Sequence, residues 1–281
     1  MKGFINYYKP SGISSAYAIN RIKKLFKGEK IGHMGTLDPL AEGVLPIAIG
    51  KATRLFDYLL DKDKVYVATF TFGYETDTLD RGGKVIKSGG KVPTESEVLK
   101  VIPSLIGTVM QVPPAYSAKN VQGKRSYELA RQGIEVELKP KKVEISQIKL
   151  INYNGDSFNF EITCKGGTYI RSIVRDMALA LNTFGTMTAL KRVKSGAFSV
   201  ENAVYEEEIV ESDLEDLLIA PDSVLSLESI YLNDELYIEL ENGRPCIATC
   251  ENGLYKVYHD EEFIGVGLVE NAILKIKARI K

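Results

Sequence analysis

The residue in this sequence best placed for chemistry is a single carboxylate, Asp38, between Leu37 and Pro39. The proline fixes its own φ and pushes Asp38 toward extended geometry, so we expect the aspartate outside any helix. The apolar run 44–49 that follows predicts a short buried strand. A loop carboxylate beside a rigid strand is a typical position for a functional group. An Asp-Pro pair is also a common turn signal, so the local pattern leaves both interpretations open.

Arg171 is the cation that we expect beside this carboxylate. It falls in the first turn of a predicted helix that follows Gly167 and runs to Asn182. The positive end of the helix dipole disfavours a cation there, so the guanidinium should face an anion. Such a partner would hold Asp38 ionised and orient it through two hydrogen bonds. On spacing alone, Arg171 and Arg175 are equally an exposed pair one helical turn apart.

The other candidate side chains carry weaker local signals. Tyr66 lies on an alternating strand, where a core aromatic is the ordinary interpretation. His33 is a loop histidine, and the only other histidine, His259, lies far along the chain, so the sequence predicts no metal site. The three cysteines lack a zinc-binding spacing, and we expect reduced thiols at Cys164, Cys246 and Cys250.

The charge distribution divides the chain into two parts. Residues 1–200 contain 30 Lys and Arg against 18 Asp and Glu, whereas residues 201–281 contain 6 against 19. The net charge of −1 therefore conceals a strongly basic body and an acidic tail. Local positive charge is what attracts a polyanion, so four basic clusters in the body favour nucleic-acid binding, although any one of them is equally typical of a solvated surface. The clusters lie at residues 21–30, 119–125, 139–142 and 190–196.

The elements that must position these residues alternate between strands and helices. Residues 64–73 alternate cleanly, with Tyr66, Ala68, Phe70 and Phe72 on one face. The other expected elements are a helix from Ser14 or Ser15 to about Lys27, a helix capped by Thr94 and Glu97 that ends near Leu105, a helix over SYELARQ that ends at Gly133, and two strands at 142–153 and 157–164 joined by a hairpin turn. The pattern is α+β with strands that pair antiparallel, and it contains no nucleotide-binding βαβ unit.

Five ordered motifs resemble the signatures of the TruB family of tRNA pseudouridine synthases, and together they cover about residues 3–203. The most specific is GHMGTLDPLAEGVLPIAIGKATR at 32–54, which departs from the usual pattern only at Met34, where a small residue is more common. The others are YKPSGISS (8–15), PPAYSAKNVQGKRSYELARQG (113–133), KGGTYIRSIVRD (165–176) and LKRVKSGAFSVENA (190–203). The motif at 113–133 departs from the family pattern at Asn120, where a lysine is usual.

The resemblance implies a role for each matched residue. Asp38 would be the catalytic residue and Arg171 its partner, while Tyr66 would stack on the target base. Tyr169 and Leu190 would line the active site, and His33 would help to hold the RNA open after base flipping. The positions that would contact RNA are Lys9, Lys119, Lys124, Arg125 and Arg192.

The resemblance also implies a fold and a reaction. The expected fold is an α+β pseudouridine-synthase catalytic domain over residues 1–224, with a mixed, mainly antiparallel central sheet flanked by helices and an RNA-binding thumb at about 113–145. A small β-rich domain similar to a PUA module would follow at 225–281. Its few basic residues leave open the alternative that it is an interdomain wedge with little RNA contact. The expected reaction converts uridine 55 in the T loop of tRNA to pseudouridine, without a cofactor or metal. The expected protein is cytoplasmic and monomeric, with no membrane span and no obligatory protein partner.

Two other functions remain open on sequence grounds. A non-catalytic RNA-binding protein would use the same basic surface without Asp38. A different carboxylate enzyme such as a glycosidase would need a second acid about 5–10 Å from the first, and Glu42 is the nearest candidate in the sequence.

Overall fold

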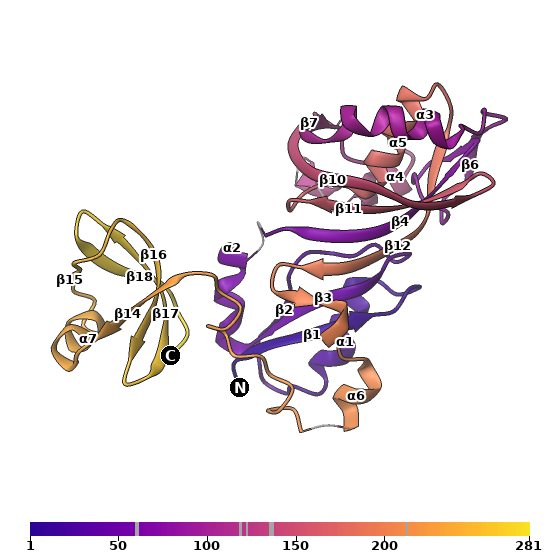
Figure 1. Cartoon of the computed structure of the whole chain (residues 1–281). Coiled ribbons are helices and arrows are strands. Elements are labelled where there is room, and N and C mark those ends of the chain that lie inside the picture. The colour runs from indigo at the N-terminus through magenta and orange to yellow at the C-terminus, as the bar shows by residue number, and fades with distance from the viewer. Residues whose placement is uncertain (60–61, 118–119, 122, 135–137, 212) are drawn as a thin grey trace.

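The computed structural model describes residues 1–59, 62–117, 120–121, 123–134, 138–211 and 213–281. A nine-stranded sheet forms the body of the chain (Figure 1). Its strands run in the order β1 (Gly3–Lys9), β3 (Glu42–Ile49), β12 (Gly185–Ser195), β4 (Lys64–Phe72), β11 (Ser157–Cys164), β10 (Lys141–Asn154) and β7 (Gly107–Gln111), with β2 (Ile31–His33) paired to β3 and β13 (Phe198–Ser199) paired to β12. Among the described strands of this sheet, only β3 and β12 pair in parallel, so the predicted mixed, mainly antiparallel sheet is confirmed.

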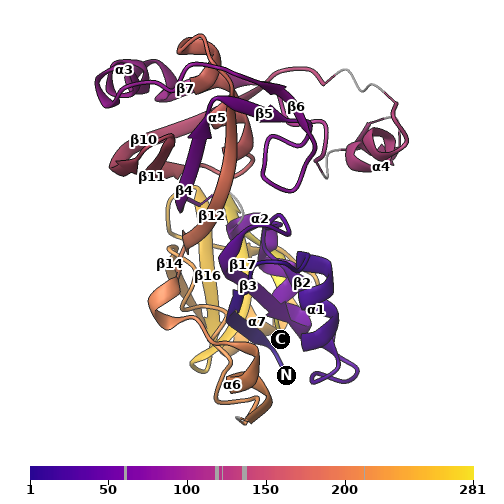
Figure 2. The ribbon, with the colours of Figure 1, turned by 90° about the vertical axis from the view of Figure 1, so that its right-hand side faces the viewer.

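Helices cover this sheet at both ends. Figure 1 shows α3 and α5 together near β7 and β10, with α1 beside β1, β2 and β3, whereas α4 stands away from the sheet (Figure 2). The helices are α1 (Ser15–Lys23), α2 (Phe56–Leu59), α3 (Glu95–Val101), α4 (Ser126–Arg131), α5 (Ile170–Ala180), α6 (Glu206–Glu211) and α7 (Asp234–Glu241), with 3₁₀ turns at Gly50–Leu55, Ile102–Leu105 and Val200–Asn202. No helix in the described ranges combines the length and the apolar character needed to cross a bilayer.

Two small hairpins and a second sheet complete the chain. The hairpins are β5 (Tyr74–Thr76) with β6 (Val85–Ser88) and β8 (Asn120–Val121) with β9 (Lys124–Arg125). The second sheet runs in the order β14 (Glu228–Leu232), β16 (Gly253–His259), β17 (Glu262–Glu270), β18 (Ile273–Arg279) and β15 (Cys246–Ile247). The expected small β-rich region after the acidic stretch is therefore present.

Local sequence signals explain most element boundaries. The hairpin of β10 and β11 turns at residues 154–157 as predicted. Thr94 and Glu97 form the expected capping box before α3. Alternate residues at the start of β4 are buried, including Tyr66, which pairs with Ile162 of β11, and Phe70. This agrees with the predicted period of two. Three helices, however, end earlier than predicted.

The early helix ends have backbone causes. The helix expected to reach Lys27 ends at Lys23, because the Lys24 amide turns back to the carbonyls of Arg21 and Ile22. The helix expected to reach Asn182 ends at Ala180, because Asn182 adopts a left-handed φ of 52°. The segment expected to remain helical to Leu105 tightens into a 3₁₀ turn from Ile102, where Pro103 follows.

One apolar cluster joins the two sheets. It combines Phe4, Val44 and Leu55 of the body with Val266 and Ala278 of the second sheet. Met34 is 4% exposed and belongs to this cluster, so its thioether contributes to the packing of the cluster. The residue that departs from the family pattern thus has a packing role.

Candidate active site

The structure places Asp38 and Arg171 in direct contact. Asp38 lies in the loop between β2 and β3, and Arg171 lies in the first turn of α5. The guanidinium grips both carboxylate oxygens, with Nε 2.8 Å from Oδ2 and Nη2 2.9 Å from Oδ1. The arginine side chain is 5% exposed and the aspartate side chain is 33% exposed. The predicted pair is confirmed, and its arginine is rigid while its carboxylate remains open to a substrate.

Further acceptors fix the guanidinium. Its Nη1 donates to the Thr78 carbonyl at 3.1 Å and lies 3.5 Å from Oδ2 of Asp80, while Nη2 donates to the Tyr116 carbonyl at 3.0 Å. Asp80 is itself held by the Thr78 hydroxyl at 2.8 Å and the Gly82 amide at 2.9 Å. Arg171 therefore joins two carboxylates and two loops. No motif in the sequence analysis pointed to Asp80.

The electrostatics of Asp38 are set by opposing influences. Burial is the largest and raises the pKa of its carboxyl above the usual range. Arg171 lowers this pKa and Asp80 raises it, and the net direction is upward. Arg171 thus acts in the expected direction by favouring the ionised carboxylate, whereas desolvation of the carboxyl is the larger influence and opposes it.

Two hollows meet at this pair. The smaller, of about 260 Å³, is lined by side chains that include Tyr66, Tyr169, Leu190, Lys64 and Arg192. The larger, of about 640 Å³, is lined by side chains that include His33, Tyr116, Asp80, Ser14 and Pro39. Both hollows are also lined by Asp38 and Arg171. The structure thus brings together all six residues predicted for catalysis and substrate binding.

Strand alternation positions Tyr66. Its side chain is 7% exposed and points to the face of β4 that also carries Ala68 and Phe70. Burial raises the pKa of the Tyr66 hydroxyl, and a hydrogen bond with Arg192 works in the opposite direction. The phenol therefore remains protonated near neutral pH.

Tyr169 is held from the edge of the sheet. Gln111, at the end of β7 and 2% exposed, donates from Nε2 to the Tyr169 carbonyl at 3.1 Å and accepts from its amide at 2.9 Å. Tyr169 is the residue before α5, so the same clamp sets the start of the helix that carries Arg171. Sequence reasoning missed Gln111, since its partner is 58 residues away along the chain.

His33 lies at the end of β2 and lines the larger hollow. Its Nδ1 is buried without a hydrogen-bond partner among the described residues. Burial is the largest influence on the ring and lowers its pKa, and the nearby Arg192 adds to this effect. The imidazole is therefore neutral in the free protein at physiological pH.

Two residues predicted to contact RNA are buried. Lys9 is 0% exposed and donates to the carbonyls of Pro10 at 2.8 Å and Ile13 at 2.7 Å. Desolvation lowers the pKa of Lys9 to about 8. Arg192 is 1% exposed and donates to the carbonyls of Val44 at 2.7 Å and Gly35 at 3.1 Å. Neither charged group lies at the surface: Lys9 holds the backbone of the loop at 10–13, and Arg192 holds Gly35 in the Asp38 loop and Val44 in β3. Contact of either side chain with RNA stays a prediction.

The other three predicted RNA contacts are not placed. Lys119 lies outside the described residues, and only the backbone of Lys124 and Arg125 is described, in β9. Their roles remain predictions.

The structure also places the second acid that a glycosidase would need and the residues that could hold a metal. Glu42, the acid considered for a glycosidase, lines neither hollow, whereas Asp80 does. Within the described ranges, one group has metal-ligand proximity, Asp234, His259 and Asp260. His259 there directs Nε2 to Asp234 at 2.9 Å and Nδ1 to Asp260 at 3.6 Å, so the two carboxylates lie on opposite ring nitrogens and do not share one ligand direction. All three cysteines are free thiols.

The fold and the site define an enzyme with an arginine-paired carboxylate at the meeting point of two hollows. The family model described as "TruB family pseudouridylate synthase (N terminal domain)" matches residues 23–170. Curated relatives named tRNA pseudouridine synthase B are 41% identical in Clostridium perfringens, with 95% of each chain covered, and 39% identical in Caldanaerobacter subterraneus, with 98% of each covered. The chain belongs to the TruB family of pseudouridine synthases.

Solved structures support the same fold. A chain in the crystal structure of a Cbf5-Nop10-Gar1 complex superposes with a TM-score of 0.76 at 23% identity, covering 99% of this chain and 85% of that one. A chain from an H/ACA RNP bound to a substrate RNA containing 2′-deoxyuridine gives 0.74 at 22% identity, with coverage of 99% and 85%. At these identities the likeness establishes the architecture.

Proposed function

We propose that this protein isomerises uridine 55 in the T loop of tRNA to pseudouridine. The observation that carries the proposal is the Asp38 carboxylate, held by two hydrogen bonds from Arg171 where the two hollows meet. Full-length similarity to enzymes named tRNA pseudouridine synthase B supports tRNA as the substrate. The reaction breaks the bond from N1 to C1′, turns the uracil and joins C5 to C1′, so it transfers no electrons to an outside acceptor.

Each lining residue has a place in this reaction. The target base must leave its stack before a side chain can reach C1′. Tyr66 and Leu190 give the smaller hollow a flat apolar wall for the extruded uracil. Asp38 then either attacks C1′ or accepts a proton from the sugar, and both routes need its ionised form. Arg171 holds the carboxylate of Asp38 in one orientation throughout the reaction.

The basic body supports binding to the rest of the tRNA. We propose that the catalytic domain spans residues 1–224, with the thumb at about 113–145, and that residues 225–281 form a PUA-like domain. We further propose that the protein acts in the cytoplasm as a monomer. The terminal domain is acidic overall, yet four of its six Lys and Arg line one pocket of about 630 Å³.

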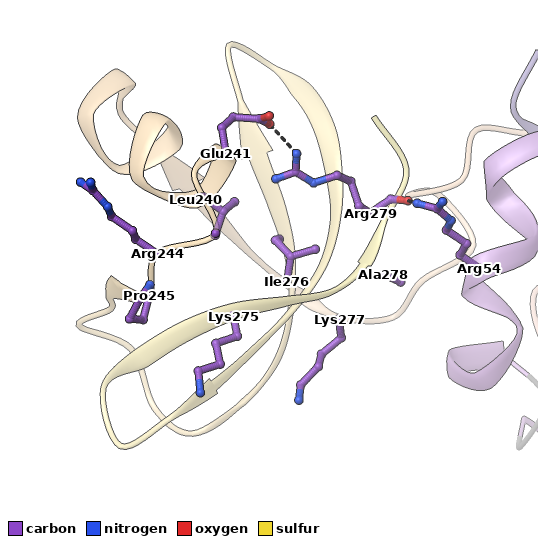
Figure 3. A pocket seen from close by; sticks show the side chains of 11 residues that line it. Arg54, Leu240, Glu241, Arg244, Pro245, Lys275, Ile276, Lys277, Ala278 and Arg279 are labelled. Atoms are coloured by element: carbon purple, nitrogen blue, oxygen red, sulfur yellow. Dashed lines mark hydrogen bonds and ion pairs between the residues drawn. The ribbon is translucent and has the colours of Figure 1, made fainter.

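Figure 3 shows this basic pocket at the junction of the two parts of the chain. Its cations are Arg54, Arg244, Lys275, Lys277 and Arg279. Arg54 of the body donates to the Arg279 carbonyl at 2.9 Å, and Glu241 pairs with Arg279 at 2.7 Å. Arg244 also pairs with Glu239 at 3.1 Å. Two acids against five cations leave a net positive surface, which supports contact with tRNA phosphates outside the T arm.

The proposed activity is tested with the purified chain, a T-arm stem-loop RNA and no added metal or cofactor. Mass spectrometry after carbodiimide derivatisation detects pseudouridine and locates it. We expect one pseudouridine at the position equivalent to 55, and none when that uridine is replaced by cytidine. An RNA recovered unmodified from the wild-type protein would overturn the proposal.

A further inference from the structure

Lys64 begins β4 and lies two residues before Tyr66. Residues two apart on a strand point to the same face, and both side chains are buried and line the smaller hollow. Lys64 is 9% exposed, which is unusual for a lysine on a strand end. The strand that presents the aromatic wall for the base therefore also presents an ammonium group.

A second cation lies beside this ammonium. Gly35 has a φ of +84°, and a side-chain carbon placed on it would lie 3.5 Å from Nη1 of Arg192 and 3.7 Å from Cε of Lys64. Both long side chains therefore pass over the same glycine. Arg192 is fixed there by the carbonyls of Val44 and Gly35. The smaller hollow thus has a cationic side, formed by Lys64 and Arg192, in addition to the pair of Asp38 and Arg171.

We propose that Lys64 is a catalytic residue that stabilises the uracil as it leaves C1′, an inference that rests on the proposed function. When the bond from N1 to C1′ breaks, its electron pair stays with the uracil. The resulting negative charge spreads over N1 and the neighbouring carbonyl oxygens. An electron pair of the base forms the new bond when C5 attacks C1′. The C5 proton is then released to water and N1 takes up a proton, so the product is an isomer of the substrate. Charge is therefore present on the base only between cleavage and rejoining.

A fixed cation acts selectively on such a charge. The bound uridine is neutral, so the ammonium gains little attraction until the bond begins to break. Pre-oriented charge in a hollow shielded from water is the arrangement with the largest catalytic effect. The assignment also explains why the buried face of β4 begins with lysine, when the same face continues with Tyr66, Ala68 and Phe70.

The test compares two leaving groups. Lys64→Met, Lys64→Gln, Lys64→Arg and the wild type are each given a T-arm stem-loop with uridine or 5-fluorouridine at the target. Fluorine makes the departing uracil anion more stable without changing its carbonyls. Loss of the starting nucleoside under single-turnover conditions measures bond cleavage. Lys194→Met is the matched control, since Lys194 lies on the neighbouring strand β12, is exposed and does not line the hollow.

We expect both neutral variants to slow cleavage of uridine on the order of a hundredfold. For 5-fluorouridine, the factor by which the same variants slow cleavage should be about ten times smaller than for uridine. Lys64→Arg should retain most of the wild-type rate on both substrates. Affinity for the RNA should change by less than about threefold, and any effect of Lys194→Met should be equal for both substrates.

Equal penalties on the two substrates, or a loss confined to RNA affinity, would overturn the assignment of Lys64 and leave the proposed function intact. Failure of the wild-type protein to make pseudouridine overturns the proposed function itself. Thermal unfolding of each variant identifies a folding defect, and having two neutral variants keeps the comparison available if one of them misfolds.

Discussion

Arg171 holds both oxygens of Asp38, at 2.8 and 2.9 Å, although 133 residues separate them in the sequence. The arginine comes from the first turn of α5, where its own helix dipole opposes its charge. The carboxylates of Asp38 and Asp80 compensate this unfavourable position. The pair therefore orients the reactive carboxylate and satisfies the arginine at the same time.

Replacing Asp38 by Asn should abolish pseudouridine formation, with a loss of at least about a thousandfold. The folded-state pKa of Asp38 is raised, so its ionised form costs stability at pH values above that pKa, and this cost disappears as the pH falls. Asp38→Asn should therefore unfold at the same temperature or a higher one. Calorimetry and a product assay on one preparation check both, and a lowered unfolding temperature would contradict the argument.

Arg171→Lys keeps the charge but removes the two-point contact. A lysine cannot present two parallel donors to Asp38 and reach the Thr78 and Tyr116 carbonyls as well. We expect kcat to fall about a hundredfold with RNA affinity nearly unchanged. Arg175→Lys, one helical turn later on α5, provides the comparison, because Arg175 lines neither hollow and should show a much smaller loss.

The acid limb of the pH profile should respond to Asp80. Asp38 acts in its ionised form, so activity is lost as the pH falls through its pKa. Asp80 raises that pKa, and Asp80→Asn should therefore move the acid limb of kcat/KM to lower pH. Arg171 lowers the same pKa, so Arg171→Met should move the limb to higher pH. Shifts in the same direction for both variants would refute this electrostatic account.

Met34→Thr restores a small polar residue where the family more often has one, but should destabilise this chain. The thioether is buried in the cluster that joins the two sheets. Its removal should lower the free energy of unfolding by about 2 kcal/mol. Met110→Thr is the control, because Met110 is 65% exposed and its replacement should change stability by less than about 0.5 kcal/mol. Urea titration followed by circular dichroism measures both.

The basic pocket of the terminal domain should matter for whole tRNA and not for the isolated T arm. Lys275→Met combined with Lys277→Met removes two of its cations. If each contacts a phosphate, the slope of log affinity against log salt should decrease by about 2 for tRNA. The T-arm stem-loop should bind as tightly as before. Lys256→Met tests the same change outside the pocket, and an equal effect there would contradict a localised site.

Much of this protein follows from local sequence. The alternation of residues 64–73 fixes which face of β4 is buried, since side chains on a strand alternate whatever lies next to it. The capping box at Thr94 and the turn after Asn154 act within a few residues, so they too are visible in the sequence. The local patterns around Asp38 and Arg171 made the two residues candidates, and the resemblance of their motifs to the family signatures supplied the pairing.

Only the tertiary structure decided how deeply each charged side chain is buried and which charged groups lie next to it. Lys9 and Arg192 were expected to contact RNA, and the fold buries both of them against backbone carbonyls. Asp80 and Gln111 join the site through contacts that no local pattern encodes. The upward pKa shift of Asp38 likewise comes from desolvation, which depends on everything packed around the carboxyl. The sequence determined which residue types are present and how short segments fold, whereas burial and charge neighbours exist only once distant segments meet.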